Sequence, residues 1–272
     1  MKIFRVEKPV KLSKLLFDNY GAELSYSTYQ KLLRNKDIKI DGKRTNKDLL
    51  LSVGQTVAVY YDGKGLELTP LFDSNGVLVF YKPPTITSED FAKKVSESFR
   101  GFELCHRLDR NTAGLLVFAR GVAYEEMLKA FKERTVDKFY LAEVYGSVKN
   151  DSETLTAYLK KDEERAEVKI FDQKVDGSDK IITEYEVVER RAETTLLKVK
   201  LITGKTHQIR AHLAHIGHFI VGDQKYGDSE INKKLKVKRQ KLIAFELIFN
   251  FDKNSPLYNI DKKKVTLKNV EI

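Results

Sequence analysis

The run His-Arg-Leu-Asp-Arg-Asn-Thr-Ala-Gly-Leu-Leu-Val-Phe-Ala-Arg, residues 106–120, carries the clearest structural signal: a charged loop leads through a turn of small residues into an apolar strand. Within this run, Asp109 lies between Arg107 and Arg110. Because a nearby cation favours the charged form of a carboxyl group, we expect Asp109 to be an ionised carboxylate. Such a group suits a nucleophile or a base, and an ordinary salt-bridge or turn aspartate is the alternative.

The totals predict a globular protein with two domains. A chain of 272 residues, 42% of them hydrophobic and 32% charged, is long enough for one sizeable core and a smaller module. The one cysteine, Cys105, can form no internal disulfide, which favours the cytoplasm. No stretch approaches the ~20 consecutive apolar residues of a membrane helix, and the first residues lack the apolar core of a signal peptide. We therefore expect no membrane partner.

Charge favours a polyanionic partner. Basic residues outnumber acidic residues by 49 to 39, which gives a net charge of +10. Lysines and an arginine cluster within residues 233–241, and three lysines form residues 262–264. Either cluster could instead be a solvated face, which is the usual fate of a charge run.

Residues 1–62 are predicted to form a small α/β module. Apolar residues recur at helical spacing in 10–20 and 27–36, and the residues from Ile38 alternate like a strand up to a turn at Asp41-Gly42. A further strand follows in 53–60. Residues 63–73, which begin with a Gly-rich charged stretch, are the predicted linker to the rest of the chain.

This module resembles the small RNA-binding domain named after ribosomal small-subunit protein S-four. Lys11-Leu-Ser-Lys-Leu-Leu matches the opening helix of that domain, and residues 29–43 match its second helix and hairpin. Two arginine-bearing motifs usual in that family are absent. The resemblance implies RNA contacts from basic residues of the second helix and hairpin, namely Lys31, Arg34, Lys36 and Lys43. A packing domain with a charged exterior is the alternative.

Residues 74–272 are predicted to form a single α+β domain. Strand-like runs recur at residues 76–81, 115–119, 139–145, 183–188, 195–201 and 242–249, and helical patterns lie at 122–134 and 206–215. Because strands and helices do not alternate regularly, we expect a largely antiparallel mixed sheet with flanking helices.

The second informative run spans residues 201–227. Thr206 is placed to cap a helix that continues to His215, with Arg210 in its interior. An arginine that faces inward needs an acidic partner, and Asp109 is the candidate. Four histidines of this run lie at spacings of five, three and three, which fit no familiar zinc helix, so we expect no metal.

Together these runs resemble the RluA-type pseudouridine synthases, which include the RluC and RluD branches and isomerise uridine in structured RNA. Four blocks occur in the family's order: residues 77–83, residues 106–117, residues 138–146, and Gly204-Lys-Thr-His-Gln-Ile-Arg with Gly222-Asp-Gln-Lys-Tyr-Gly. The chain departs from the family pattern at Pro84, Phe219 and Ile243.

The resemblance implies a role for each matching residue. Asp109 would be the catalytic aspartate, Tyr140 would lie against the uracil ring, and Arg210 would pair with the catalytic carboxylate. Arg107 would enter the RNA stack when the target base leaves it, and Lys82 and Leu108 would line the same RNA-binding region. The base must detach, turn and reattach through carbon five, which needs no net redox change and no cofactor.

The sequence therefore predicts a monomeric RNA isomerase that acts on large-subunit ribosomal RNA by base flipping. The competing hypothesis is a non-catalytic RNA-binding or ribosome-assembly factor that keeps the same scaffold. The presence of Asp109, Tyr140 and Arg210 argues against this second hypothesis, because a binder gains nothing from a buried acid facing a polyanion.

Overall fold

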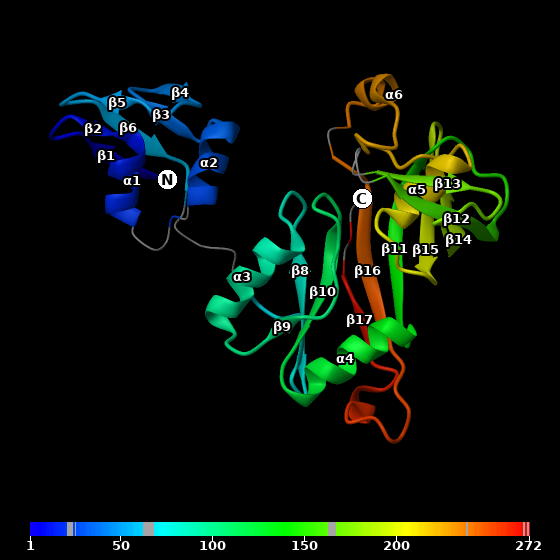
Figure 1. Ribbon diagram of the computed structural model, residues 1–272. Coiled ribbons are helices and arrows are strands. Elements are labelled where there is room, and N and C mark those ends of the chain that lie inside the picture. Colours follow the sequence, from blue (N-terminus) through cyan, green and yellow to red (C-terminus); the bar gives the residue numbers. More distant parts are fainter. Residues whose placement is uncertain are drawn as a thin grey trace. The chain divides into compact units, whose positions relative to one another are not determined.

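The computed structural model describes residues 1–20, 24, 26–61, 68–162, 167–237, 239–268, 270 and 272. The chain divides into two compact units, Met1–Glu67 and Leu68–Ile272 (Figure 1). The first part of the predicted linker, residues 63–67, lies outside the described residues. Its last two residues, Phe72 and Asp73, belong to a strand of the second unit, so this unit begins earlier than the sequence predicts.

The described part of the first unit contains two helices and six short strands. The helices are α1 (Leu12–Tyr20) and α2 (Tyr26–Asn35). The strands are β1 (Lys2–Arg5), β2 (Val10–Lys11), β3 (Ile38–Ile40), β4 (Lys43–Thr45), β5 (Leu50–Leu51) and β6 (Thr56–Val59). Four strands form a sheet in the order β1-β6-β3-β4, and β2 pairs with β5.

The predicted hairpin is present between β3 and β4. Asp41 and Gly42 have φ values of 47° and 78°, and two successive left-handed residues are what a tight two-residue hairpin turn requires. Apolar residues of both helices pack with the sheet, and Leu12, Leu16, Tyr29 and Ile38 are fully buried. The helical spacing in the sequence thus corresponds to the buried faces of α1 and α2.

One large sheet organises the second unit (Figure 1). Its eleven strands run in the order β13-β12-β14-β15-β11-β16-β10-β8-β7, with β17 paired to β16 and β9 paired to β10. Among the described residues, β10 and β16 pair in parallel and the other strand pairs are antiparallel. The predicted α+β fold with a largely antiparallel sheet is confirmed.

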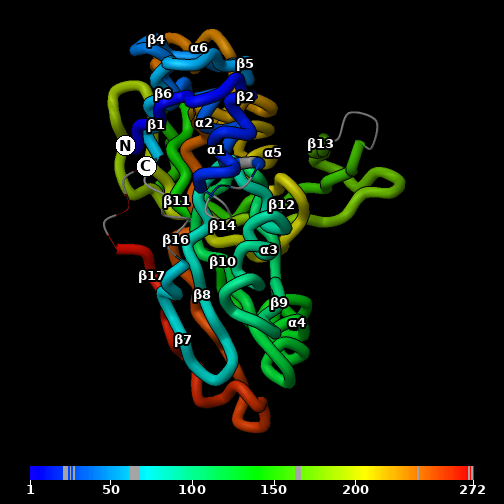
Figure 2. The backbone as a smooth tube through the Cα atoms, turned by 90° about the vertical axis from the view of Figure 1, so that its left-hand side faces the viewer, coloured from blue at the N-terminus to red at the C-terminus, as the bar shows by residue number. Residues whose placement is uncertain are grey.

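The strands and helices of this unit follow one another along the chain. The strands are β7 (Phe72–Ser74), β8 (Val77–Lys82), β9 (Glu103–Leu104), β10 (Ala113–Ala119), β11 (Val136–Tyr145), β12 (Ser152–Asp162), β13 (Glu167–Phe171), β14 (Asp179–Arg190), β15 (Thr194–Leu201), β16 (Leu242–Phe249) and β17 (Lys264–Thr266). The helices are α3 (Ser88–Ser98), α4 (Val122–Glu133), α5 (Gln208–His215), α6 (Ser229–Lys234) and the 3-10 helix Tyr258–Ile260. Figure 2 shows β13 at the outer end of the sheet.

Residues 77–80 of β8 and all of β10 are buried on both faces, which explains their continuous apolar sequences. Alternate residues point to opposite faces of a strand. Phe80 and Phe118 accordingly pack in one core with Phe91 of α3, whereas Val79 and Val117 pack in another core with Met127 of α4. Helices α3 and α5 contribute to the first of these cores and α4 to the second.

Gly114 allows β10 and β16 to approach each other. The two strands pair in parallel at Gly114 and Ala244, where Gly114 has a φ of 128°. A Cβ atom at this position would lie 2.2 Å from the carbonyl oxygen of Ala244. The glycine of the small-residue turn is therefore required by this contact, which joins the two halves of the large sheet next to the loop that carries Asp109.

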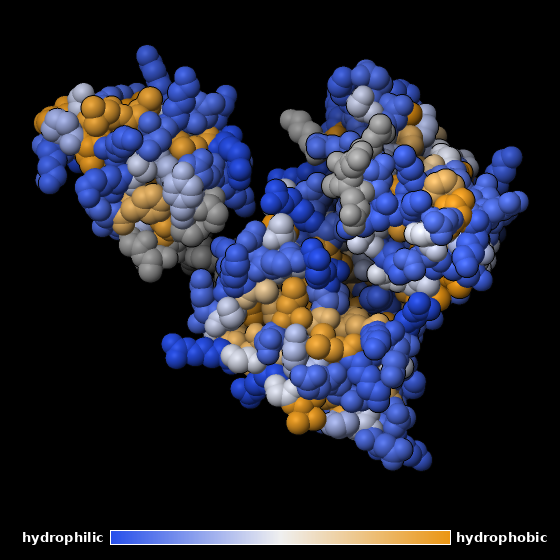
Figure 3. All heavy atoms as spheres, viewed as in Figure 1, coloured by the Kyte–Doolittle hydropathy of each residue, from blue (hydrophilic) through white to orange (hydrophobic). Residues whose placement is uncertain are grey.

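Hydrophilic side chains cover much of the visible face of the second unit (Figure 3). Three of the exposed large apolar side chains of this unit lie at separate positions in the chain: Leu71 precedes β7, Val122 begins α4 and Val188 lies on β14. None of the helices in the described part of the chain has the length and apolar composition needed to cross a membrane.

Candidate active site

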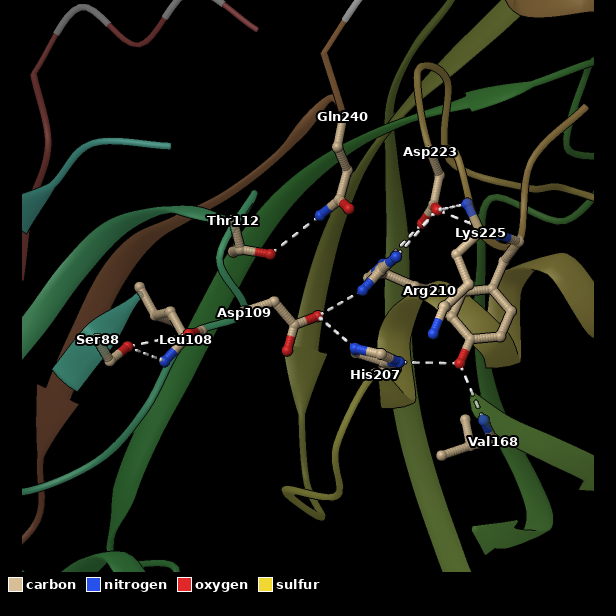
Figure 4. Close-up of polar contacts among 11 residues, drawn as sticks. Ser88, Leu108, Asp109, Thr112, Val168, His207, Arg210, Asp223, Lys225 and Gln240 are labelled. Atoms are coloured by element: carbon tan, nitrogen blue, oxygen red, sulfur yellow. Dashed lines mark hydrogen bonds and ion pairs between the residues drawn. The ribbon is translucent and has the colours of Figure 1, made fainter. Parts of the chain in front are cut away.

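The loop between β9 and β10 carries Asp109, and its backbone is fixed on both sides of this residue. The Ser88 hydroxyl donates to the carbonyl oxygen of Leu108 and accepts from its N–H, both at 2.9 Å (Figure 4). The N–H of Thr112 donates to the carbonyl oxygen of Asp109 at 3.1 Å. The carboxylate itself is 24% exposed, so it is held in place and still reachable from solvent.

Arg210 reaches Asp109 from helix α5. Its Nη1 donates to Asp109 Oδ2 at 2.9 Å, although the two residues are 101 positions apart in the chain. The side chain of Arg210 is 9% exposed. The structure thus confirms the predicted contact between this inward-facing arginine and Asp109.

Asp223 holds the same guanidinium from the other side (Figure 4). Arg210 Nε donates to Asp223 Oδ2 at 2.7 Å, and Nη2 donates to Oδ1 at 3.0 Å. Burial opposes both charges, but the mutual hydrogen bonds and opposite charges outweigh it, raising the pKa of Arg210 and lowering the pKa of Asp223. The result is a row of three groups, Asp223, Arg210 and Asp109, in which the guanidinium lies between two carboxyl groups.

Sequence reasoning did not identify Asp223 as part of this site. The residue belongs to the block Gly222-Asp-Gln-Lys-Tyr-Gly, which was the available signal. Asp223 Oδ1 also accepts from the backbone N–H groups of Lys225 and Tyr226, at 2.8 Å and 3.1 Å. These bonds form a tight turn that brings Tyr226 back toward Arg210, whose guanidinium carbon lies 5.1 Å from the Tyr226 ring centre.

His207 is a second residue that sequence reasoning did not assign to the site. It precedes α5 in a left-handed conformation with a φ of 56°, so His207 occupies the N-cap and the prediction that Thr206 caps the helix is wrong. His207 Nε2 lies 3.8 Å from Asp109 Oδ2, and Nδ1 lies 2.9 Å from the Tyr226 hydroxyl. Burial lowers the pKa of His207, Arg210 and Lys225 lower it further, and Asp109 opposes them. The imidazole is therefore neutral at neutral pH.

Tyr140 lies in the core on β11, where the pairing with β16 is interrupted by a bulge between Phe139 and Tyr140. Its ring is buried, and burial together with the negative charge of Asp109 raises the pKa of the hydroxyl. The phenol therefore stays protonated near the carboxylate. β-bulges often occur next to functional sites, where they change the direction of a side chain. The bulge before Tyr140 is such an irregularity in an otherwise regular strand.

The two arginines that flank Asp109 in sequence do not pair with it. Arg107 Nε instead contacts Glu89 of α3, and its side chain is 75% exposed. Within the described part of the chain, the ion pairs of Asp109 are those with Arg210 and His207. The sequence led us to expect Arg107 and Arg110 as the cations next to Asp109. In the structure the cation is Arg210, which comes from a distant helix.

Lys82 and Leu108 are interior residues next to Asp109 in the fold, and their predicted place lining the RNA-binding region stays a prediction. Lys82 has no exposed surface, and its ammonium donates to the carbonyl oxygens of Pro83, Ile86 and Arg110 at 3.0 to 3.3 Å. Burial lowers the pKa of Lys82 to about 8, and the charge of Asp109 opposes this shift. Leu108 is 7% exposed and packs in the core. Both residues therefore hold the Asp109 loop.

The four basic residues predicted for the first unit are exposed. Lys31 and Arg34 lie on α2, Lys36 follows it, and Lys43 begins β4. The four histidines of the second informative run bind different partners. His212 contacts Thr183 and His215 contacts Asp172, at 3.0 Å and 2.8 Å. No group of three metal-ligating side chains occurs among the residues that the structure describes.

Comparison with known proteins places the chain in a family. The profile of the RNA pseudouridylate synthase family matches residues 76–215. An uncharacterised RNA pseudouridine synthase of Aquifex aeolicus is 30% identical over 264 residues, covering 85% of this chain and 82% of the relative. A relative from Helicobacter pylori with the same description is 37% identical, covering 63% of this chain and 69% of its own.

A third relative, the ribosomal large subunit pseudouridine synthase C of Vibrio vulnificus, is 28% identical and covers 77% of this chain and 74% of its own. The solved structure of human RNA pseudouridylate synthase domain containing 1 covers 68% of this chain and 80% of its own, with a TM-score of 0.61 at 29% identity. The family predicted from the sequence is confirmed. This chain belongs to the RNA pseudouridylate synthases, in their RluA-type branch, and is an isomerase that acts on RNA.

Proposed function

We propose that Asp109 is the carboxylate that drives uridine isomerisation and that Arg210 and Tyr140 act with it. The observation that carries this proposal is the row Asp223, Arg210, Asp109, in which a buried guanidinium grips one oxygen of a partly exposed carboxylate. Asp223 and Arg210 are buried, and Asp109 is the member of the row that is partly exposed to solvent. A substrate would therefore meet the carboxylate of Asp109.

The reaction breaks the bond between the sugar and N1 of uracil and forms a bond between the same sugar carbon and C5, while C5 loses a proton and N1 gains one. The carboxylate has three routes open to it: attack on the sugar, attack on the ring, and removal of a sugar proton to give a glycal. Each route needs the charged form of Asp109. Arg210 supplies a fixed cation for this form, and such preorganised charge needs no rearrangement during the reaction.

Tyr140 supplies a flat surface for the detached base. Its ring is held by β11, and its hydroxyl stays protonated because burial and Asp109 raise its pKa. A neutral aromatic face adjacent to the carboxylate can stack on uracil while the base turns. Exposed Arg107, oriented by Glu89, would fill the gap in the RNA after the target base leaves, which repays part of a flipping cost of about a few kcal/mol.

The substrate that we propose is large-subunit ribosomal RNA. Two relatives, from Vibrio vulnificus and Haemophilus influenzae, are named ribosomal large subunit pseudouridine synthase C. The net charge of +10 suits a polyanion, and the first unit would add contacts through Lys31, Arg34, Lys36 and Lys43. Ribosomal RNA is an intracellular substrate, so the same proposal locates the protein in the cytoplasm, where it would act as a monomer.

Mapping pseudouridines across total RNA tests the substrate proposal. Cells that lack this chain are compared with cells that receive the wild-type chain or the Asp109→Asn variant. The proposal predicts one or more sites in large-subunit ribosomal RNA that are lost with the gene and restored by the wild type alone. Sites confined to other RNAs, or restoration by Asp109→Asn, would contradict it.

A further inference from the structure

Both side chains that contact the carboxylate of Asp109 face the same oxygen. Arg210 Nη1 lies 2.9 Å and His207 Nε2 lies 3.8 Å from Oδ2 (Figure 4). Within the described residues, no hydrogen bond or ion pair engages the other oxygen, Oδ1. The two oxygens of the carboxylate therefore differ: Oδ2 faces Arg210 and His207, whereas Oδ1 has no such partner among the described residues.

The proton on His207 can be placed from the hydrogen bonds around it. The N–H of Val168 on β13 donates to the Tyr226 hydroxyl at 3.0 Å, since a backbone N–H can only donate. The phenol hydrogen then remains to be donated, and His207 Nδ1 at 2.9 Å is the acceptor it reaches among the described residues. Nδ1 is thus unprotonated, and a neutral imidazole must carry its proton on Nε2, which faces Asp109.

The backbone of His207 supports a role beyond packing. Its left-handed conformation, with a φ of 56°, is unfavourable for a residue with a Cβ atom. Strain of this kind persists where the surroundings fix it, and it concentrates at functional sites. Here Tyr226 fixes the ring, and Tyr226 is itself fixed by Val168 and by the turn at Asp223.

We propose that His207 is a positioning residue, whose Nε2–H acts with Arg210 on Oδ2 so that Oδ1 of Asp109 is the oxygen presented to the uridine. The relay from Val168 through Tyr226 to His207 sets the tautomer that makes this possible. The inference rests on the proposed catalytic role of Asp109, but the tautomer itself does not depend on that role.

The tautomer is tested first, by nitrogen-15 NMR of the His207 ring in the full chain near neutral pH, without RNA. The expected signals are an unprotonated Nδ1 and a protonated Nε2. The Tyr226→Phe variant keeps the ring beside Arg210 but removes the donor to Nδ1, so its spectrum should shift toward the other tautomer. A protonated Nδ1 in the wild type would overturn the proposal.

Two substitutions of His207 then test its role in turnover. Gln places an N–H near the position of Nε2, whereas Leu fills similar space without a donor, and neither is β-branched at this left-handed position. His207→Leu should lower kcat about 10-fold with KM for RNA unchanged, and His207→Gln should recover most of that loss. Equal losses in both variants, or full activity of a folded His207→Leu protein, would contradict the proposal.

A control and a cross-check separate this inference from the proposed function. His215→Gln changes a histidine at the end of the same helix, which pairs with exposed Asp172, and it should leave kcat unchanged. If Asp109→Asn kept full turnover, the proposed function would fail while the NMR result for His207 could still hold. If Asp109→Asn were inactive and His207→Leu were not, only the present inference would fail.

Discussion

Arg210 and Asp109 meet at 2.9 Å across 101 positions of sequence, and the fold fixes this pair before any substrate arrives. The guanidinium cannot swing away, because Asp223 holds its opposite edge through two further bonds. Planar, bidentate recognition of this kind is specific to arginine. The pair thus acts as a preset charge arrangement on which the proposed reaction at Asp109 would depend.

Replacing Arg210 with Lys should separate charge from geometry. A lysine keeps the positive charge but has one nitrogen, which cannot grip Asp223 and Asp109 in the same geometry. We expect Arg210→Lys to lower kcat at least about 10-fold while RNA affinity changes little, measured by single-turnover kinetics and by equilibrium RNA binding. Arg191→Lys is the matched control, since Arg191 also bridges two carboxylates, Glu143 and Glu189, away from this site. Wild-type kcat in Arg210→Lys would refute this prediction.

Asp223→Asn should act mainly on stability. The change leaves Arg210 buried with only one of its two carboxylate partners. Removing one partner of a buried ion pair typically lowers the free energy of unfolding by about 3 kcal/mol. The urea unfolding transition of the second unit measures this loss of stability. Asp172→Asn removes the partner of His215 from an exposed position and should leave the unfolding midpoint nearly unchanged. Equal unfolding midpoints for the two variants would show that the ion pair between Asp223 and Arg210 contributes nothing to stability.

Gly114→Ala tests the close approach of β10 and β16. The added Cβ would lie 2.2 Å from the carbonyl oxygen of Ala244, so the strands must separate, at a cost of about 2 kcal/mol or more. Gly101→Ala is the control, because Gly101 also has a positive φ but no atom within 4 Å of the added Cβ. Thermal unfolding should show a clearly larger loss for Gly114→Ala, and a similar loss in both would mean that backbone strain alone matters.

Activity should decline on the alkaline side as Lys82 loses its proton. Burial lowers the pKa of Lys82 to about 8, so the group is an ammonium below that pH and a neutral amine above it. The ammonium has three hydrogens for three carbonyl oxygens, whereas the amine has two, so deprotonation releases one anchor of the Asp109 loop. A pH profile of kcat should fall through about pH 8, and Lys82→Met should be less active and lack this decline. A flat wild-type profile would contradict this account.

The sequence predicted the parts of the fold whose apolar residues recur regularly. Strands β8, β10, β11, β15 and β16 and helix α4 follow such patterns. By contrast, α3 was missed because its buried residues are few and lie among charged ones, and β12 was missed although Leu155, Ala157 and Leu159 alternate along it with Thr156 and Tyr158. For α3 the signal was the pair Thr87 and Asp90, where Thr87 caps the helix by accepting from the Asp90 N–H.

The candidate site likewise has contacts that the sequence could predict and contacts that it could not. Arg210 stands out as a charged residue inside a partly apolar helix and Asp109 as a lone carboxylate between two arginines, so their pairing could be predicted. The contacts of Asp223 and His207 depend on a turn and on a left-handed residue, and neither conformation has a clear pattern in one sequence. The burial of Lys82 could not be predicted, because residue type alone does not distinguish a lysine on the surface from one whose ammonium donates to three carbonyl oxygens inside the protein.

The central claim, that Asp109 carries out the isomerisation, is tested most directly by single-turnover pseudouridine formation with purified Asp109→Asn protein on large-subunit ribosomal RNA. Asn keeps the size and one acceptor oxygen but cannot carry the negative charge. The account predicts no detectable pseudouridine with RNA binding and thermal stability close to those of the wild type. Pseudouridine formation at the wild-type rate by this variant would contradict it.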